Sequence, residues 1–201
     1  MDRIQNTVTN FEFRPTSIRN VLHNLELPSR LTNAFTEAAV LLPVFNIENN
    51  PHILLTKRSD KTTYHKGEIA LPGGTKEPSD STSLETALRE TQEELGIQPS
   101  TVEILGQLNT VTTKTGFLIN SFVGEIRGRC PLTINYHEVA DTIELPISLL
   151  AHWADTSESL ESNQPGFHYG PHYIWGATFR ILKEFSLIIK QSCKMEMTNS
   201  W

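Results

Sequence analysis

Cysteines, long apolar runs and an excess of basic residues are scarce or missing in this sequence. Its two cysteines, Cys130 and Cys193, lie far apart and form no CxxC pair, so neither a zinc site nor a disulfide framework is indicated. No apolar run reaches the roughly 20 residues that cross a bilayer. The amino terminus lacks the apolar segment typical of a secretory signal. We therefore expect a cytoplasmic protein with reduced thiols and no membrane partner.

The charge balance narrows the range of partners further. With 17 Lys and Arg against 23 Asp and Glu, the formal net charge is −6, whereas a general nucleic-acid binder needs a basic face. We therefore expect no nucleic-acid partner. A small molecule that carries phosphate remains compatible, because a bound divalent cation would reverse the local charge. A length of 201 residues fits a single domain with one substantial core.

One amphipathic helix is predicted over residues 82–95, where apolar residues recur at helical spacing. Asp80 or Ser81 is a candidate N-cap, and Glu85 lies close to capping-box spacing. Gly96 is the residue type that closes a helix in the left-handed conformation. The segment therefore carries its own start and stop signals.

Three carboxylates, those of Glu90, Glu93 and Glu94, gather on another face of this helix, where like charges repel one another. A hard cation such as Mg²⁺ or Mn²⁺ between them would reverse that repulsion, because carboxylate oxygens are its preferred ligands. An acidic run is more often only a solvated helix face. The upstream pair Gly73-Gly74 favours a binding site, because glycines let backbone atoms approach a ligand closely.

These residues resemble the Nudix box, GX5EX7REUXEEXGU, in which U is a bulky apolar residue. Residues 89–97, RETQEELGI, match REUXEEXGU with Thr91 in place of the first apolar residue. Gly74 and Asp80 match GX5E with Asp for Glu, and eight residues instead of seven precede Arg89. This one-residue insertion is expected of the coenzyme A pyrophosphatase branch of the Nudix hydrolases.

An upstream segment resembles a second pattern of that branch, LLTxR[SA]x3Rx3Gx3FPGG. Residues 54–59, then Gly67, then residues 71–74 match it in register. Two positions depart, because Thr63 stands where the second Arg belongs and Leu71 replaces Phe. Together the two patterns identify the chain as a member of the Nudix family and resemble its coenzyme A branch.

The resemblance implies an α/β/α sandwich with a mixed central sheet, which also agrees with the expected order of elements. We expect a helical N-terminal extension at 1–34, a Nudix hydrolase domain at 35–192 and a C-terminal tail at 193–201. Trp175 is expected in the core. Besides the central helix, the predicted elements are a short helix near 18–25, strands at 38–45, 52–56, 68–71, 101–108, 117–126 and 131–135, a helix at 146–153, a hairpin at 166–175 and a helix at 177–191.

Hydrolysis of a diphosphate needs charge neutralisation and an aligned water. The resemblance assigns Glu90, Glu93, Glu94 and the Gly74 carbonyl to Mg²⁺ or Mn²⁺. Arg89 either orients one of these carboxylates or pairs with Asp80 to pin the loop to the helix. The general base stays open between Glu93 or Glu90 in the box and Glu138 in a later loop.

Substrate phosphates are expected near Arg58 and Lys66, which precede Gly73 and Gly74. The Arg58 loop is also a candidate for reading the 3′-phosphate of coenzyme A. The implied reaction converts coenzyme A, or its acylated or oxidised forms, into 4′-phosphopantetheine and adenosine 3′,5′-bisphosphate. The alternatives are a hydrolase of another dinucleotide or nucleotide-sugar diphosphate, and an inactive Nudix-fold binding protein. A homodimer stays open, because no residue argues for or against it.

Overall fold

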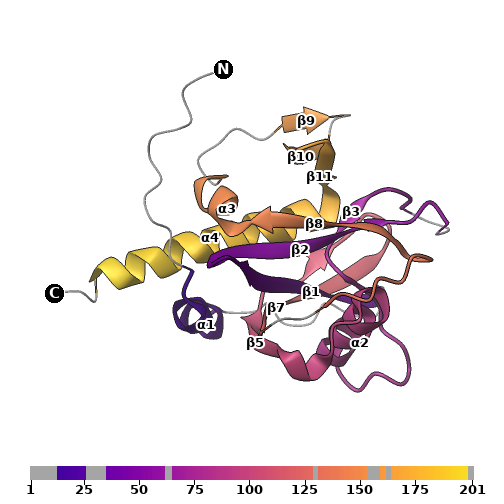
Figure 1. Cartoon of the computed structure of the whole chain (residues 1–201), viewed down its shortest axis with the longest axis horizontal. Coiled ribbons are helices and arrows are strands. Elements are labelled where there is room, and N and C mark those ends of the chain that lie inside the picture. Colours follow the sequence, from indigo (N-terminus) through magenta and orange to yellow (C-terminus); the bar gives the residue numbers. More distant parts are fainter. Residues whose placement is uncertain are drawn as a thin grey trace.

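The computed structural model describes residues 13–25, 35–61, 65–128, 131–153, 159–161 and 164–198. Figure 1 shows helices packed on a central sheet. The helices are α1 (Pro15–His23), α2 (Ser83–Leu95), the 3₁₀ turn η1 (Pro99–Thr101), α3 (Ile147–Trp153) and α4 (Gly176–Thr198). The strands are β1 (Thr36–Ile47), β2 (Asn50–Arg58), β3 (Ile69–Ala70), β4 (Gly73–Thr75), β5 (Val102–Gln107), β6 (Val111–Thr112), β7 (Phe117–Ile126), β8 (Val139–Pro146), β9 (Ser159–Glu161), β10 (Gln164–Tyr169) and β11 (His172–Trp175).

Strands β1 and β2 form the predicted hairpin but pair with each other only near its turn. Glu48 and Asn49 at the turn have φ of 48° and 66°, the left-handed pair that a two-residue hairpin turn uses. Beyond the pair Val44–Ile53 the two strands separate, so that β3 pairs with β2 and β4 pairs with β1. The segment that carries the two glycines therefore lies in the fork between β1 and β2.

The central sheet is mixed, as the sequence predicts. On its other edge β1 pairs in parallel with β7, and β7 pairs antiparallel with β5 and β6. Strand β8 pairs antiparallel with β2. Strands β9, β10 and β11 form a separate antiparallel sheet, which contains the predicted hairpin with its turn at Gly170.

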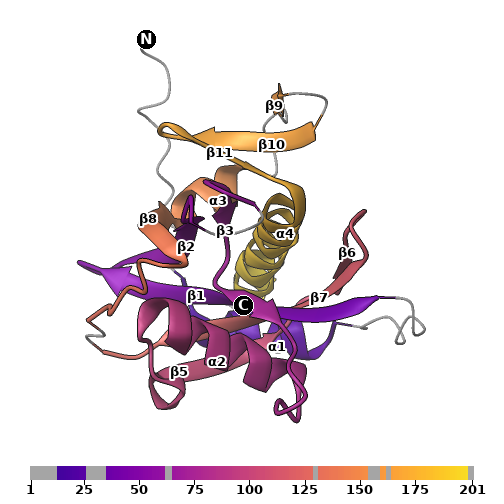
Figure 2. The same cartoon turned by 90° about the vertical axis from the view of Figure 1, so that its right-hand side faces the viewer.

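Helices cover both faces of the central sheet, which makes the molecule an α/β/α sandwich. Figure 2 shows α2 on one face and α4 on the other. On the α4 side, the apolar stripe of that helix is fully buried against the sheet, with Leu182, Phe185 and Ile189 at its centre. On the α2 side, Ala87 packs against Leu41 of β1. None of the helices in the described part is both long and apolar enough to span a membrane.

The predicted N-terminal helix packs directly on the domain. Helix α1 buries Ile18, Val21 and Leu22 in the same core as α4 and β5. Arg19 of α1 also forms an ion pair with Glu103 of β5. Residues 15–23 are therefore part of the folded core that lies behind the sheet.

Two sequence predictions are wrong. Residues 131–135 form no strand, because the backbone N–H groups of Thr133 and Asn135 donate to the carbonyls of Leu95 and Glu94 at the end of α2. The strand in this region is β8, which follows the predicted one and pairs with β2. The expected tail at 193–201 is helical as far as Thr198, because no proline or glycine interrupts α4 before that point.

Candidate active site

Helix α2 begins with a complete capping box. The Thr82 hydroxyl oxygen accepts a hydrogen bond from the backbone N–H of Glu85 at 3.1 Å. The Glu85 carboxylate accepts in return from the backbone N–H groups of Thr82 at 3.3 Å and Ser81 at 2.6 Å. The N-cap is therefore Thr82, not Asp80 or Ser81 as predicted. The predicted end at Gly96 is confirmed by its left-handed conformation, with φ of 74°.

Gly73 and Gly74 place backbone atoms directly against the carboxylates of α2. A Cβ on Gly74 would lie 2.5 Å from the carboxyl carbon of Glu90. A Cβ on Gly73, where φ is 150°, would lie 2.3 Å from the carbonyl oxygen of Ala39. The backbone N–H of Gly73 also acts on the Glu94 carboxylate and opposes the rise of its pKa. Gly73 is therefore required by a close approach of two backbones, whereas a side chain at Gly74 would force the Glu90 carboxylate to move.

Arg89 makes both kinds of contact that its place in the sequence left open. Its Nε and Nη2 each lie 3.0 Å from an oxygen of Asp80. Its Nη1 lies 3.0 Å from Oε1 of Glu90 and 3.0 Å from Oε2 of Glu93. Nη2 also donates to the carbonyl of Thr75 in β4 at 3.3 Å. Arg89 thus connects the loop, the glycine strand and the helix carboxylates.

Asp80 is buried, with 9% of its surface exposed, and remains charged. Its main partner is Arg89, and the backbone N–H of Glu77 and the hydroxyl of Thr86 donate to it as well. These hydrogen bonds hold the pKa of Asp80 well below its usual range. The same pairing raises the pKa of Arg89.

Glu94 is the most deeply buried carboxylate of the three on α2, with 3% of its surface exposed. Burial raises the pKa of Glu94 to about 8, and the nearby charges of Glu90 and Glu138 act in the same direction, against Arg58 and the Gly73 N–H. Its Oε2 has no hydrogen-bond partner in the described part of the chain. A cation at this point would offset both the repulsion and the lost hydration of this oxygen.

Glu138, a residue of the loop before β8, lies near the same carboxylates. Burial is the main cause of the raised pKa of Glu90, and the charge of Glu138 adds to it. The side-chain amide of Asn135 donates to Oε1 of Glu138 at 3.1 Å, and the backbone N–H of Asn135 donates to the Glu94 carbonyl at 2.9 Å. The Glu138 carbonyl accepts from the Ser59 N–H at 2.8 Å. The loop is therefore tied both to α2 and to the end of β2.

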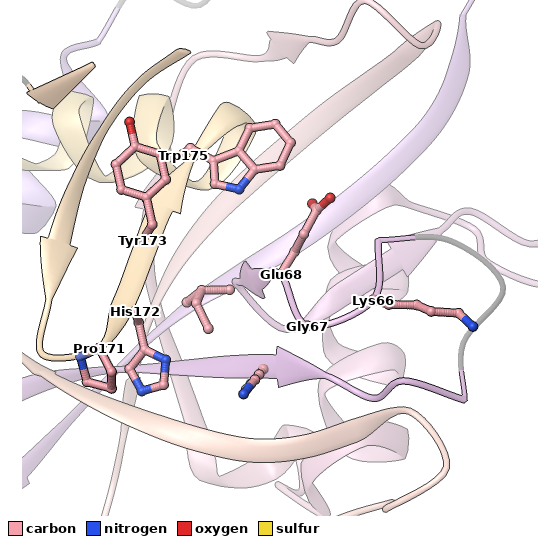
Figure 3. Close-up of a pocket in the computed structure, with 9 residues that line it drawn as sticks. Lys66, Gly67, Glu68, Pro171, His172, Tyr173 and Trp175 are labelled. Atoms are coloured by element: carbon pink, nitrogen blue, oxygen red, sulfur yellow. The ribbon is translucent and has the colours of Figure 1, made fainter. Parts of the chain in front are cut away.

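The two cations expected to bind substrate lie in different places. Arg58 faces the carboxylates, with its Nη1 4.0 Å from Oε1 of Glu94. Lys66 is exposed and lies at the rim of a separate pocket, where its side chain points away from the β10–β11 hairpin (Figure 3). Thr63, which replaces the second Arg of the pattern, lies outside the described residues.

That separate pocket, of about 340 Å³, lies between β3 and the β10–β11 hairpin and was not predicted. Lys57 and Trp175 line it, whereas Trp175 was expected in the core. Nothing in the sequence pointed to this pocket, because β3 and β11 are distant in the chain and contact each other only through the tertiary fold.

The donor set fits a hard divalent cation. The Glu90 carboxylate lies against Gly74, Glu94 and Glu138 add carboxylates whose charges act on it or on each other, and the buried Oε2 of Glu94 is unpaired among the described residues. Among the described residues, no group of three or more Asp, Glu, His or Cys side chains is already arranged to hold a metal ion. Glu93 instead pairs with Arg89. Its side chain is 51% exposed, so a change of rotamer is unobstructed on its solvent side.

Comparison with known proteins agrees with these features. The family model described as NUDIX domain matches residues 35–140. The chain is 36% identical over 165 residues to "Uncharacterized Nudix hydrolase NudL" of Photorhabdus laumondii subsp. laumondii. This match covers 79% of this chain and 88% of that protein. It is 32% identical over 188 residues to the protein of the same name from Escherichia coli (strain SMS-3-5), covering 89% of this chain and 97% of that protein.

A solved structure with a similar fold is the MutT/nudix family protein from Enterococcus faecalis. Its TM-score is 0.52 at 18% identity, and the match covers 87% of this chain and 71% of that chain. At this identity the likeness supports the fold alone. Because the NUDIX model matches more than half of the chain and the two relatives match most of its length, the chain belongs to the Nudix family and is a hydrolase that acts on pyrophosphate bonds.

Proposed function

We propose that this Nudix hydrolase cleaves the diphosphate of coenzyme A, or of its acylated or oxidised forms, to 4′-phosphopantetheine and adenosine 3′,5′-bisphosphate. The observation that carries the proposal is the contact between Arg58 and Glu94, whose Nη1 and Oε1 lie 4.0 Å apart. Arg58 belongs to the upstream pattern that resembles the coenzyme A branch, and Glu94 belongs to the Nudix box. The two patterns therefore meet at one site, as a joint role in one reaction requires.

Glu90, Glu93, Glu94 and the carbonyl of Gly74 are the residues that we assign to Mg²⁺ or Mn²⁺. When bound, the metal neutralises the phosphate oxygens and lowers the pKa of the attacking water. Arg89 positions two of these carboxylates, those of Glu90 and Glu93, through its Nη1. Gly74 keeps the space beside Glu90 free of a side chain. Arg58 places a positive charge where the diphosphate would approach Glu94.

We assign the general base to Glu138. Its Oε1 accepts a hydrogen bond from Asn135, which orients the carboxylate and leaves Oε2 to take the proton of the attacking water. The carboxylate is near Glu90 and Glu94 but is less buried than Glu94. Glu138→Gln should lower kcat by orders of magnitude and leave KM nearly unchanged. An unchanged kcat would return the role to Glu90 or Glu93.

The two departures from the coenzyme A pattern bear differently on this proposal. Leu71 is buried in the core on the α4 side, with 3% exposed, so its replacement of Phe concerns packing. Thr63 removes one positive charge from the loop, and this keeps a different nucleoside diphosphate derivative as the alternative substrate. An inactive binding protein is disfavoured, because Arg89, Glu90, Glu93 and Glu94 are all present, and Arg89 pairs with Glu90 and Glu93.

A substrate panel tests the proposal. Coenzyme A, dephospho-coenzyme A, NADH, ADP-ribose and diadenosine polyphosphates would be compared by kcat/KM with Mg²⁺ and with Mn²⁺. We expect coenzyme A to exceed the others by at least about tenfold, the discrimination that one charge-assisted contact supplies. Glu94→Gln, assayed in parallel, shows whether the turnover comes from this site. A higher kcat/KM for any other compound would discard the coenzyme A assignment and keep the Nudix chemistry.

A further inference from the structure

The pocket between β3 and the β10–β11 hairpin lies on the face of the sheet that carries α4, and it plays no part in the chemistry proposed above. It has a volume of about 340 Å³, within the range of small-molecule sites and suited to a group the size of one nucleoside. The residues that define its character are Lys57, Glu68, Ile69, His172, Tyr173 and Trp175.

Lys57 and Arg58 are neighbours in β2 but serve opposite faces of the sheet. Arg58 reaches Glu94 on α2. Lys57 is paired with Ile69 of β3 and lines the pocket with Trp175 of β11. Consecutive strand residues point to opposite faces, and the register of β2 with β8 shifts between these two residues. The loop cations are therefore divided between two sites.

The walls of the pocket combine aromatic rings with hydrogen-bonding groups. Figure 3 shows Tyr173 and Trp175 side by side along β11, His172 at the turn, and Glu68 extending toward the indole. Tyr173 is held in place, because its hydroxyl donates to the Gln164 carbonyl at 2.6 Å and its ring contacts the His168 ring at 4.9 Å between centroids. These rings form a preorganised wall against which a planar group can pack.

The donors of the pocket are available for a ligand. In the described part of the chain, no hydrogen bond or ion pair engages the side chains of Lys57, His172 or Trp175. Glu68 provides an acceptor at the opposite wall, where His65 contacts it at 3.0 Å. The pocket thus offers an ammonium group and an imidazole for an anion, aromatic faces for a ring, and a carboxylate for an amino group.

The pocket and the carboxylate site lie close enough together for one nucleotide to reach both. Ile69 lines the pocket, and Gly73, four residues later, contacts Glu94. Four residues of extended chain span at most roughly 13 Å at about 3.3 Å per residue, and the bend at Pro72 shortens this separation. Figure 1 shows β11, β3 and α2 at the same end of the sheet. Strand β11 contacts β3, and helix α2 contacts β4, the strand that follows β3. A substrate can therefore reach both sites around this end.

We propose that this pocket binds the 3′-phosphorylated purine nucleoside of the substrate, while its diphosphate lies at the carboxylates of α2. The purine packs against Trp175 and Tyr173, its exocyclic amino group donates to Glu68, and Lys57 with His172 binds the 3′-phosphate. The identity of this nucleoside rests on the coenzyme A proposal. Arg58 then acts on the diphosphate, and Lys57 is the cation that distinguishes coenzyme A from its 3′-dephospho form.

Binding of the free nucleotide tests the pocket without turnover. Adenosine 3′,5′-bisphosphate and adenosine 5′-monophosphate would be titrated into the metal-free protein by calorimetry. We expect the wild type to bind the bisphosphate more tightly. Lys57→Met, which keeps the aliphatic stem, should weaken bisphosphate binding about tenfold, the value of one charge-assisted contact, and should abolish the preference over the monophosphate. Lys61→Met removes an exposed cation from the loop after β2, outside the pocket; it is the matched control and should bind as the wild type does.

Trp175→Leu tests the aromatic wall and should weaken both nucleotides together, by about fivefold to a hundredfold for the loss of one stacked base. In hydrolysis assays, Lys57→Met should raise KM for coenzyme A much more than for dephospho-coenzyme A. Melting temperatures of each variant would show that the fold is retained.

The results separate the two proposals. Bisphosphate binding that depends on Lys57 and Trp175 in a protein that does not cleave coenzyme A would support the pocket and reject the proposed substrate. Cleavage of coenzyme A with the same affinities and KM in Lys57→Met and Trp175→Leu as in the wild type would overturn the pocket and keep the substrate. Absence of bisphosphate binding to the wild type would also overturn it.

Discussion

Arg89 holds Asp80 through two parallel hydrogen bonds, Nε to Oδ1 and Nη2 to Oδ2, each 3.0 Å long. The aspartate is one methylene shorter than the glutamate that the Nudix box usually carries, and it still makes the complete bidentate pair. Because the remaining nitrogen of Arg89 contacts Glu90 and Glu93, the pair fixes the loop and the helix carboxylates relative to one another.

Asp80→Asn should destabilise the protein at neutral pH by about 2 kcal/mol, the value of hydrogen bonds to a charged group. The folded pKa of Asp80 lies below its ordinary value of 3.8, so this stabilisation is present above that pH and is lost as the pH falls through and below it. Urea unfolding of both proteins at a series of pH values would measure the difference. Asp60→Asn, an exposed control, should have little effect. A wild-type advantage that persists undiminished at the acid end would contradict the pairing.

Gly74→Ala should lower kcat about 100-fold, because displacement of a catalytic group by about 1 Å has that effect. The added Cβ would meet the Glu90 carboxyl carbon at 2.5 Å, so the carboxylate must move. Gly116→Ala is the control for activity, because its Cβ would have nothing within 4 Å; its φ of 86° is positive, so this variant should lose some stability but keep its kcat. Steady-state kinetics and melting temperatures would be measured for both variants. Activity within twofold of the wild type for Gly74→Ala would show that the position of Glu90 is not critical.

Glu94→Gln should remove the stabilisation by Mg²⁺. A ligand present at 100 times its Kd stabilises the folded state by about 2.7 kcal/mol, which a thermal shift assay detects as a rise in melting temperature. We expect this rise for the wild type and for Glu144→Gln, an exposed acid on β8, but not for Glu94→Gln. Turnover of Glu94→Gln, and likewise of Glu93→Gln, should fall by orders of magnitude while the proteins remain folded in EDTA. Equal Mg²⁺ shifts in all variants would place the metal elsewhere.

Arg58→Ala should reduce turnover of coenzyme A and dephospho-coenzyme A by the same factor, about tenfold or more for a lost charge-assisted contact. The reason is that Arg58 lies at Glu94, 4.0 Å away, where the diphosphate common to both compounds would bind. From the sequence alone, the Arg58 loop is a candidate for reading the 3′-phosphate, which favours a larger loss on coenzyme A. Measurement of kcat/KM for the two substrates decides whether Arg58 binds the diphosphate or the 3′-phosphate. A loss confined to coenzyme A would show that Arg58 binds the 3′-phosphate.

Leu22→Ala should cost about 3 kcal/mol of unfolding free energy, typical of a leucine truncated in a packed core. Leu22 is 4% exposed and lies against Gly106 of β5, so α1 belongs to the folded core and not to a detachable extension. Leu187→Ala on α4, where the side chain is 54% exposed, should change stability by less than about 0.5 kcal/mol. Chemical denaturation measures both. Similar small values for the two variants would mean that α1 packs only loosely.

The errors of sequence-based prediction occurred where long-range contacts decide. Residues 131–135 have strand-like composition, yet Thr133 and Asn135 hydrogen-bond to the end of α2. Strand β8 was missed because alternating acids obscure its apolar residues, Val139, Ile143 and Leu145, which become evident only in pairing with β2. The N-cap was misplaced because Asp80 is a good cap by type, but Arg89 engages it.

The sequence by itself determined the central helix with its glycine end, the β1–β2 and β10–β11 hairpins, and the carboxylates of the Nudix box. These features depend on residues three or four positions apart, or on turns of two residues, so local chemistry is sufficient. Only the tertiary structure decided that Glu138 lies near Glu94, and which site lies on each of the two faces that Arg58 and Lys57 occupy. Those relationships depend on the fork between β1 and β2 and on the register shift beside β8. Such features arise from packing between segments distant in the chain, which no local pattern records.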